Sequence, residues 1–209
     1  MSRSADRITR LRSRGRLNRE KLLREAERLL SINGDGGVRF SDVFEAAGVS
    51  RGSAYRIYIG IDDLMQDLAG EWINNFVHFL SDEEPAESPT TWMLLSDFIV
   101  ERASQYWTAT AETLKVMPRI RSNSPASYRT AVIELSGCIA GLFDRYFEMP
   151  DIPDWNDKIS FYTQICDTSF SDAVRVDGAI GEQRIAEAQA LCRTFLSFYL
   201  PGELPPRSD

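Results

Sequence analysis

The stretch VFEAAGVSRGSAYRIY, residues 43–58, predicts two short helices joined by a tight turn. Ala47 closes the first helix, Gly48 can adopt the left-handed conformation that a tight turn requires, and Ser50 can cap the second helix. Two short helices that pack across one turn need apolar residues at the spacing found here, at Val43, Ala47, Val49, Ala54 and Ile57. The stretch therefore predicts a helix-turn-helix.

The second helix of this motif presents polar and basic residues on its outward side. They are Arg51, Ser53, Tyr55 and Arg56. Side chains of these types hydrogen-bond to base edges and phosphates when a helix lies in the major groove of DNA. The motif thus favours a DNA-binding protein.

Charge is divided unequally along the 209 residues. Residues 1–59 hold 13 Lys and Arg against 7 Asp and Glu, a net charge of +6, whereas residues 60–209 hold 11 against 24, a net charge of −13. A basic end on an acidic body attracts phosphate locally, although the whole chain carries −7. The overall acidity therefore does not exclude a nucleic-acid partner.

Residue types that build metal, redox or catalytic sites are scarce. Cys138, Cys166 and Cys192 lie far apart in apolar helical patterns, which is typical of buried free thiols. With His78 as the single histidine and no Cys-x-x-Cys spacing, we expect no metal site and no cofactor. No nucleophile motif or phosphate loop is present, so we expect no enzymatic activity.

Membrane and export signals are also missing from the sequence. No apolar run approaches the roughly 18 residues of a membrane span, and the arginine-rich N-terminus has no apolar core of the secretory type. We therefore expect a cytoplasmic protein.

Apolar periodicity predicts an all-α fold of about nine helices in three parts. Residues 1–16 lack a packing stripe and are expected to form a basic, mobile arm. Residues 17–60 form the helix-turn-helix domain, whose first helix runs from Asn18 to Ile32 and stops at the sequence NGDGG. Residues 61–209 form a ligand-binding and dimerisation domain. Its helices are expected at 62–80, at 89–110, in a shorter segment ending near 117, and at 124–147, 155–176 and 182–200.

Large aromatic residues on several helices of the third part predict a pocket for a small apolar or aromatic molecule. The alternative is that they form ordinary core. The candidate ligand-binding residues, with two amides as hydrogen-bonding groups, are Trp72, Asn75, Phe76, Phe79, Phe98, Gln105, Trp107, Tyr128, Phe143 and Tyr146. His78 could also orient a ligand, although a position on the surface or rim is favoured.

The last two helices carry small residues on one and aromatic residues on the other, a pattern that suits a four-helix dimer seam. Core packing within one chain is again the alternative. The candidate dimer-interface residues are Tyr162, Ile165, Ser169, Ala173, Ala188, Leu191, Phe195 and Phe198.

Residues 22–80 resemble the tetracycline-repressor (TetR) family of transcriptional regulators. The resemblance lies in AAGVSRGSAY at 46–55, followed by Tyr58, Asp62 and Leu64. It implies a homodimer that places the helix at 51–57 of each subunit in successive major grooves of a near-palindromic operator. It also implies that a small-molecule effector bound in the C-terminal bundle releases the DNA, so that the protein acts as a repressor.

By the same resemblance, Tyr55 and Tyr58 would lie against the sugar-phosphate backbone, and Ser53 and Arg56 near base edges or phosphate. Basic residues near the motif complete the predicted DNA-binding set, which is Arg14, Arg16, Arg39, Ser50, Arg51, Ser53, Tyr55, Arg56 and Tyr58.

Three positions depart from the family pattern. Ile61 stands where a lysine usually meets a phosphate, which removes one contact in each subunit. Phe44 replaces a small alanine between the two short helices, and either changes their crossing angle or fills a neighbouring gap. Arg39 replaces the usual threonine cap, which leaves Ser41 as the expected cap. Ile61 and Phe44 also keep open an alternative: a dimeric helical adaptor that has lost sequence-specific DNA binding.

Overall fold

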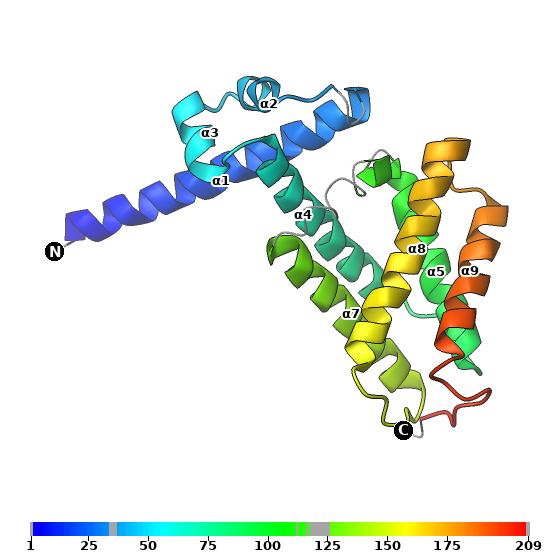
Figure 1. Ribbon diagram of the computed structural model, residues 1–209. Coiled ribbons are helices and arrows are strands. Elements are labelled where there is room, and N and C mark those ends of the chain that lie inside the picture. Colours follow the sequence, from blue (N-terminus) through cyan, green and yellow to red (C-terminus); the bar gives the residue numbers. More distant parts are fainter. Residues whose placement is uncertain (1, 34–36, 112, 116, 118–125, 208–209) are drawn as a thin grey trace.

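The computed structural model describes residues 2–33, 37–111, 113–115, 117 and 126–207, with the side chains of 2–12 and 126–128 excepted. Within this part the secondary structure is helical apart from one isolated bridge between Phe147 and Pro206, so the all-α prediction is confirmed. The helices named in Figure 1 are α1 Ser2–Asn33, α2 Phe40–Ala46, α3 Arg51–Ile57, α4 Ile61–Ser81, α5 Trp92–Ala109, α7 Ala126–Tyr146, α8 Trp155–Asp177 and α9 Glu182–Leu196.

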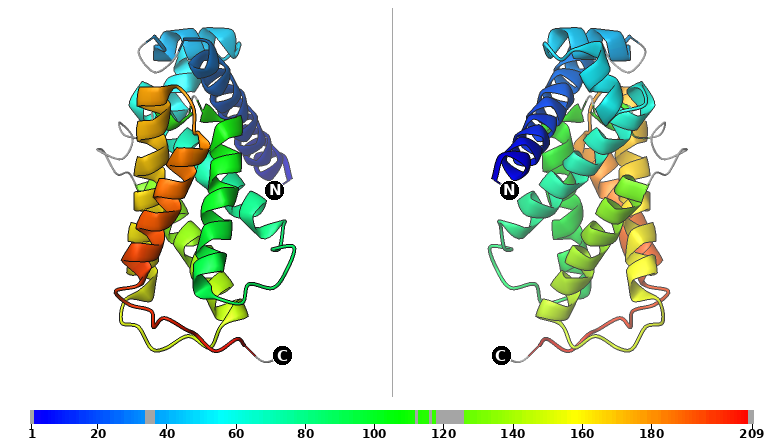
Figure 2. Two further views of the ribbon diagram at one scale, coloured as in Figure 1. Left: turned by 90° about the vertical axis from the view of Figure 1, so that its right-hand side faces the viewer. Right: turned by 90° about the vertical axis from the view of Figure 1, so that its left-hand side faces the viewer.

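The molecule consists of a small head on a larger helical body (Figure 1 and Figure 2). In the head, α1 packs against α2, α3 and α4. The body contains α5, α7, α8 and α9, and α4 extends from the head into it, where α4 packs against α5 and α7. One helix thus belongs to both parts.

Helix α1 is much longer than the sequence predicted. The helix begins at Ser2 instead of Asn18, so the predicted boundary between arm and helix at residue 17 is wrong. No proline occurs between residues 2 and 33, and Arg16 pairs with Glu20 one turn along, at 3.6 Å, which favours a continuous helix. The predicted stop is correct, since α1 ends at Asn33.

The turn between α2 and α3 has the predicted geometry. Gly48 has φ of +61°, which costs glycine little, and the Val49 amide donates to the Phe44 carbonyl at 2.9 Å. Ser50 stands in the N-cap position of α3, where its carbonyl accepts from the Ala54 amide at 2.9 Å. The two short helices are therefore held in a fixed relation.

Several helix starts differ from the prediction. Arg39, not Ser41, occupies the N-cap position of α2, and the Asp42 carboxylate accepts from the Arg39 amide at 3.4 Å. Helix α5 begins at Trp92, three residues after the expected Pro89, because Thr91 supplies the cap by accepting from the Leu94 amide at 3.3 Å. The expected start of a helix at residues 124–125 lies outside the described residues.

Candidate nucleic-acid interface and effector cavity

The exposed side of α3 carries the basic and aromatic side chains that the sequence predicted there. Arg51, Tyr55 and Arg56 are exposed and Ser53 is half-buried. Arg56 donates from Nε to the Gly52 carbonyl at 2.9 Å, which holds its guanidinium along the helix. The Arg51 guanidinium lies 5.6 Å from the centre of the Tyr55 ring, a cation–π distance. Contacts within α3 therefore hold both guanidinium groups.

Phe44 fills a gap beneath this face. Its ring is 5.6 Å from that of Phe40 and 6.3 Å from that of Tyr55, and Phe40 and Tyr55 meet edge to face at 5.2 Å. Tyr55 remains 49% exposed while Phe44 is 9% exposed, so the bulky residue supports Tyr55 from below. Of the two alternatives raised by the sequence, the structure favours gap filling.

Tyr58 does not lie on the surface. Its side chain is only 5% exposed, and its hydroxyl donates to Asp67 Oδ2 on α4 at 2.5 Å. Burial, followed by this hydrogen bond, raises the pKa of Tyr58 far above its usual value. The predicted contact of Tyr58 with the DNA backbone is therefore corrected: the residue anchors the end of α3 to α4.

Arg19, which the sequence did not single out, completes this anchor. It donates from Nε to Asp67 Oδ2 at 2.7 Å and from Nη2 to Glu71 Oε1 at 2.8 Å. Hydrogen bonding to Asp67 raises the pKa of Arg19, so the pair stays charged. A signal was present in the sequence, because Asp67 and Glu71 are acidic residues one turn apart in the same helix. Through these bonds α1, α3 and α4 meet at one point.

The remaining predicted DNA-binding residues lie around α3. Ser50 is exposed, and its hydroxyl bonds to that of Ser53 at 3.0 Å. Arg39 is exposed and its Nε donates to Asp42 at 3.1 Å, a bond that lowers the pKa of Asp42. Arg14 and Arg16 are exposed on α1. Ile61, at the first position of α4, packs against the apolar core and brings no charge to the surface.

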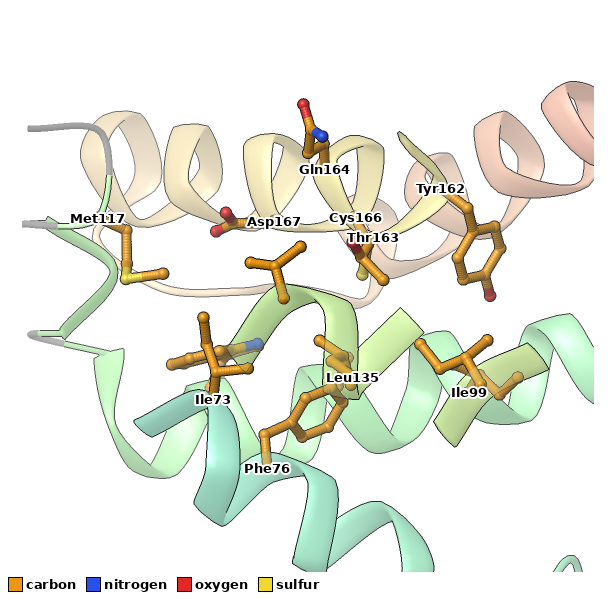
Figure 3. Close-up of a pocket in the computed structure, with 14 residues that line it drawn as sticks. Ile73, Phe76, Ile99, Met117, Leu135, Tyr162, Thr163, Gln164, Cys166 and Asp167 are labelled. Atoms are coloured by element: carbon orange, nitrogen blue, oxygen red, sulfur yellow. The ribbon is translucent and has the colours of Figure 1, made fainter. Parts of the chain in front are cut away.

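A small apolar cavity of about 50 Å³ lies in the body between α4, α5, α7 and α8 (Figure 3). Two predicted ligand-binding residues, Phe76 and Trp107, line it. In Figure 3, Ile73 and Phe76 rise into it from α4, and Thr163 and Cys166 point down into it from α8, while Gln164 points away. Its lining residues are Ile73, Phe76, Ile99, Ala103, Trp107, Met117, Val132, Leu135, Ile139, Tyr162, Thr163, Gln164, Cys166 and Asp167.

Other predicted ligand-binding residues have different surroundings. Trp72 is buried and its Nε1 donates to Glu27 of α1 at 2.9 Å. Phe143 is buried against Trp155, with the ring centres 5.7 Å apart, and Phe79 lies under the Arg102 guanidinium at 3.8 Å. Phe98 and Tyr146 are half-buried and pack against the core, whereas Asn75, Gln105 and His78 are exposed. The Tyr128 side chain lies outside the described residues. The aromatic pattern thus marked core packing more often than the cavity.

The sequence missed the contribution of α8 to the cavity. Tyr162, predicted for the dimer seam, lines the cavity instead, and its hydroxyl donates to the Ser96 carbonyl at 3.1 Å. The Thr163 hydroxyl donates to the Ser160 carbonyl at 2.8 Å. These polar groups are satisfied within the protein, so the cavity wall favours an apolar occupant.

The outer side of α8 and α9 carries a groove with exposed apolar walls. Phe161, Leu191 and Phe198 are 52%, 53% and 77% exposed. Of the predicted dimer residues, those that line the groove are Ile165, Ser169, Leu191, Phe195 and Phe198. Tyr162, Ala173 and Ala188 are at most 1% exposed inside the body, so their prediction as interface residues is corrected. Tyr162 and Ala188 belong instead to the apolar core of the same chain.

Known structures share this architecture, although no protein-family model and no curated protein matches the sequence. A TetR transcriptional regulator from Rhodococcus sp. RHA1 superposes with a TM-score of 0.71 at 15% identity, over 88% of this chain and 98% of that one. A TetR-family transcriptional regulator from Streptomyces coelicolor gives 0.67 at 19% identity, over 88% and 99%. The chain has the TetR-family fold. The fatty acid degradation regulator FadR from Bacillus halodurans is also similar, with a TM-score of 0.61 at 13% identity, over 85% and 94%.

In this TetR-family fold, the described residues contain no candidate metal site and no candidate membrane-spanning helix. No group of three or more His, Cys, Asp or Glu in that part of the chain could hold a metal ion. None of the helices described is both long and apolar enough to cross a bilayer.

The cysteines of this TetR-fold chain are expected to differ in reactivity. Cys166 and Cys192 are buried, and burial raises the pKa of Cys192 to about 12 and that of Cys166 well above its usual value. A raised pKa keeps a thiol protonated and unreactive at neutral pH. We expect iodoacetamide to alkylate the half-buried Cys138 first in the native protein, and all three thiols after unfolding in urea, as read by mass spectrometry. Equal labelling of all three in the native protein would contradict this burial.

Proposed function

We propose that this protein is a dimeric, sequence-specific DNA-binding transcriptional regulator, released from a near-palindromic operator by a small apolar or aromatic effector. The proposal rests on the exposed face of α3, which presents Arg51, Tyr55 and Arg56. The Tyr55 ring lies under the Arg51 guanidinium and packs against the Phe40 ring. Arginine can pair bidentately with guanine or phosphate, and an ordered guanidinium loses little entropy on binding. The similarity to solved transcriptional regulators supports the same function.

Dimerisation through the groove on α8 and α9 would place two recognition helices on one duplex. Its walls include the exposed apolar residues Phe161, Leu191 and Phe198, which a second copy of the same groove would cover. Two identical half-sites then explain a near-palindromic operator.

The cavity suits an effector that works by enlarging it. At about 50 Å³ it is smaller than the roughly 300–1,000 Å³ of ordinary ligand pockets, so a drug-sized molecule fits only if the surrounding helices move apart. An effector would therefore bind the displaced arrangement better, which shifts the population toward it. Coupling of about 1–3 kcal/mol would give roughly 5–150-fold release of DNA.

A chain of contacts leads from this cavity to the head. Phe76, which lines the cavity, packs against Tyr106 with ring centres 5.2 Å apart. The Tyr106 hydroxyl donates to the Trp72 carbonyl at 2.8 Å, and the Trp72 indole donates to Glu27 at 2.9 Å. Through these contacts, displacement of Phe76 by an effector would shift α1, which packs against α2 and α3.

Selection of random duplex DNA by the purified protein tests the proposed function. We expect the wild-type chain to enrich one palindrome, with a dissociation constant of about 10⁻⁸ to 10⁻¹¹ M at physiological salt. Arg56→Ala should weaken binding to it by about 1–3 kcal/mol, or roughly 5–150-fold, because a guanidinium contact is lost.

Arg145→Ala is the matched control, since Arg145 is an exposed arginine on α7 that pairs with Glu84 at 3.2 Å and lies outside the groove. It should bind the palindrome like the wild-type chain. If no sequence is enriched at low or moderate salt, the regulator proposal fails and a helical adaptor takes its place.

A further inference from the structure

Gly52 occupies the point of α3 that lies farthest from the core of the head. At about 100° per residue, the buried Ala54 and the half-buried Ile57 lie about 160° and 140° from Gly52 around the helix, on opposite sides. Both of these residues belong to the packing of the apolar core. The exposed Tyr55 and Arg56 lie about 60° and 40° from Gly52, again on opposite sides. Gly52 therefore marks the centre line of the exposed face of α3.

The fold itself does not require a glycine at this position. Gly52 is exposed within α3, and the positive φ values that favour glycine occur elsewhere, at Gly48 and Gly178. A β-carbon at position 52 would meet no atom within 4 Å beyond its chain neighbours and the α3 backbone. Glycine also destabilises a helix relative to alanine, because it loses more conformational freedom on folding. A side chain at this position would therefore stabilise the monomer.

The neighbouring side chains leave the backbone at Gly52 uncovered. Arg56 donates from Nε to the Gly52 carbonyl at 2.9 Å and from Nη2 to Ser53 Oγ at 3.4 Å, so its guanidinium is held toward Ser53. On the other side of Gly52, the Arg51 guanidinium lies 5.6 Å from the centre of the Tyr55 ring. Bare backbone thus lies between two guanidinium groups. Helix α3 itself lies in the head, at the opposite end of the molecule from the C-terminus (Figure 1).

We propose that Gly52 determines how deeply α3 enters the major groove, because bare backbone on its centre line can contact the edges of the bases. The inference rests on the proposed function, in which the exposed face of α3 meets the duplex. A helix with its side chains is about 10–12 Å across and the major groove is about 12 Å wide, so little room remains for an added group on the leading side. Gly52 is thus a specificity-determining residue, although it has no side chain to hydrogen-bond to a base.

Three variants test this inference: Gly52→Ala, Gly52→Leu and the matched control Gly137→Ala. Gly137 is also an exposed glycine within a helix, and a β-carbon there would likewise meet no atom within 4 Å. It lies on α7, outside both the cavity and the groove. Urea titration measures stability. Titration of two labelled duplexes, the palindrome selected by the wild-type chain and a scrambled sequence of the same length, measures specific and non-specific binding.

Stability and operator affinity are expected to change in opposite directions at position 52. Alanine and leucine are better helix formers than glycine, so all three variants should unfold at a higher urea concentration than the wild type. Gly52→Ala should bind the palindrome at least about tenfold more weakly, and Gly52→Leu more weakly still, because the added group overfills the contact with the bases. Gly137→Ala should bind the palindrome like the wild type. Binding to the scrambled duplex should stay within about twofold in all variants, since non-specific binding depends on charge and no charge changes.

Three results would overturn the inference while leaving the regulator proposal intact. The first is a Gly52→Ala variant that binds the palindrome within about twofold of the wild type. The second is a lower urea midpoint for that variant, because the glycine would then serve the fold. The third is an equal loss of affinity for the palindrome and the scrambled duplex, because the lost contact would then not involve bases. If the wild-type chain selects no palindrome, the proposed function itself fails.

Discussion

A chain carrying both Leu191→Asp and Phe198→Asp is expected to be a folded monomer that binds the palindromic operator at least about 100-fold more weakly than the wild type. The two side chains are 53% and 77% exposed along the groove of α8 and α9, so their replacement leaves the core of the monomer intact. The two substitutions place two negative charges on each side of a self-complementary interface. These four like charges repel one another across it. A monomer then binds only one half-site and loses the second set of contacts.

Sedimentation equilibrium measures the oligomeric state and titration of labelled operator measures the affinity. Leu94→Asp with Ile133→Asp is the matched control, because these residues are 52% and 68% exposed on α5 and α7. The control should remain dimeric. A dimer that persists in the Leu191 and Phe198 variant would show that another surface joins the subunits.

Trp72→Ala is expected to lower the free energy of unfolding by about 3–5 kcal/mol, the usual cost of removing a large buried aromatic side chain. Trp72 is 2% exposed in α4 and its Nε1 bonds to Glu27 at 2.9 Å, so the substitution creates a cavity and removes the partner of a carboxylate. Urea titration followed by circular dichroism measures the loss. A cost below about 1 kcal/mol would mean that α1 and α4 do not depend on this contact.

A milder pair of variants separates stability from coupling. Trp72→Phe keeps an aromatic ring but removes the indole donor to Glu27, and Trp92→Phe does the same for the bond from Trp92 to the Pro201 carbonyl. Both tryptophans are 2% exposed, so similar losses of stability are expected. Only Trp72→Phe should change operator affinity, because only Trp72 bonds to α1. Equal effects on DNA binding would remove Trp72 from the route between cavity and head.

Local rules predicted the elements whose ends are set by nearby residues. Gly48 fixed the turn of the helix-turn-helix, and the apolar spacing of α4 and α8 placed both helices within a residue or two. The start of α1 escaped prediction because an arginine-rich segment without an apolar stripe gives no packing signal, although it contains no helix breaker except Gly15.

The functional surfaces were predicted less completely, because burial depends on partners distant in the sequence. The sequence does not reveal that Asp67 draws the Tyr58 hydroxyl inward or that Ala188 packs within its own chain. An aromatic stripe likewise does not separate Phe76, which lines the cavity, from Phe143, which packs on Trp155. The exposed residues of α3 were predicted well, since polar and basic side chains on a short amphipathic helix have one stable orientation.

The sharing of α4 between head and body limits how this protein can be recombined. Arg19, Tyr58 and Glu27 of the first 60 residues all bond to side chains of α4. A hybrid that joined residues 1–60 to the helical body of another protein would leave the half-buried Arg19 and the Tyr58 hydroxyl without their acceptors on α4. A functional hybrid must therefore keep α4 together with the head. The helices of the other protein must then pack against the C-terminal end of α4, as α5 and α7 do here.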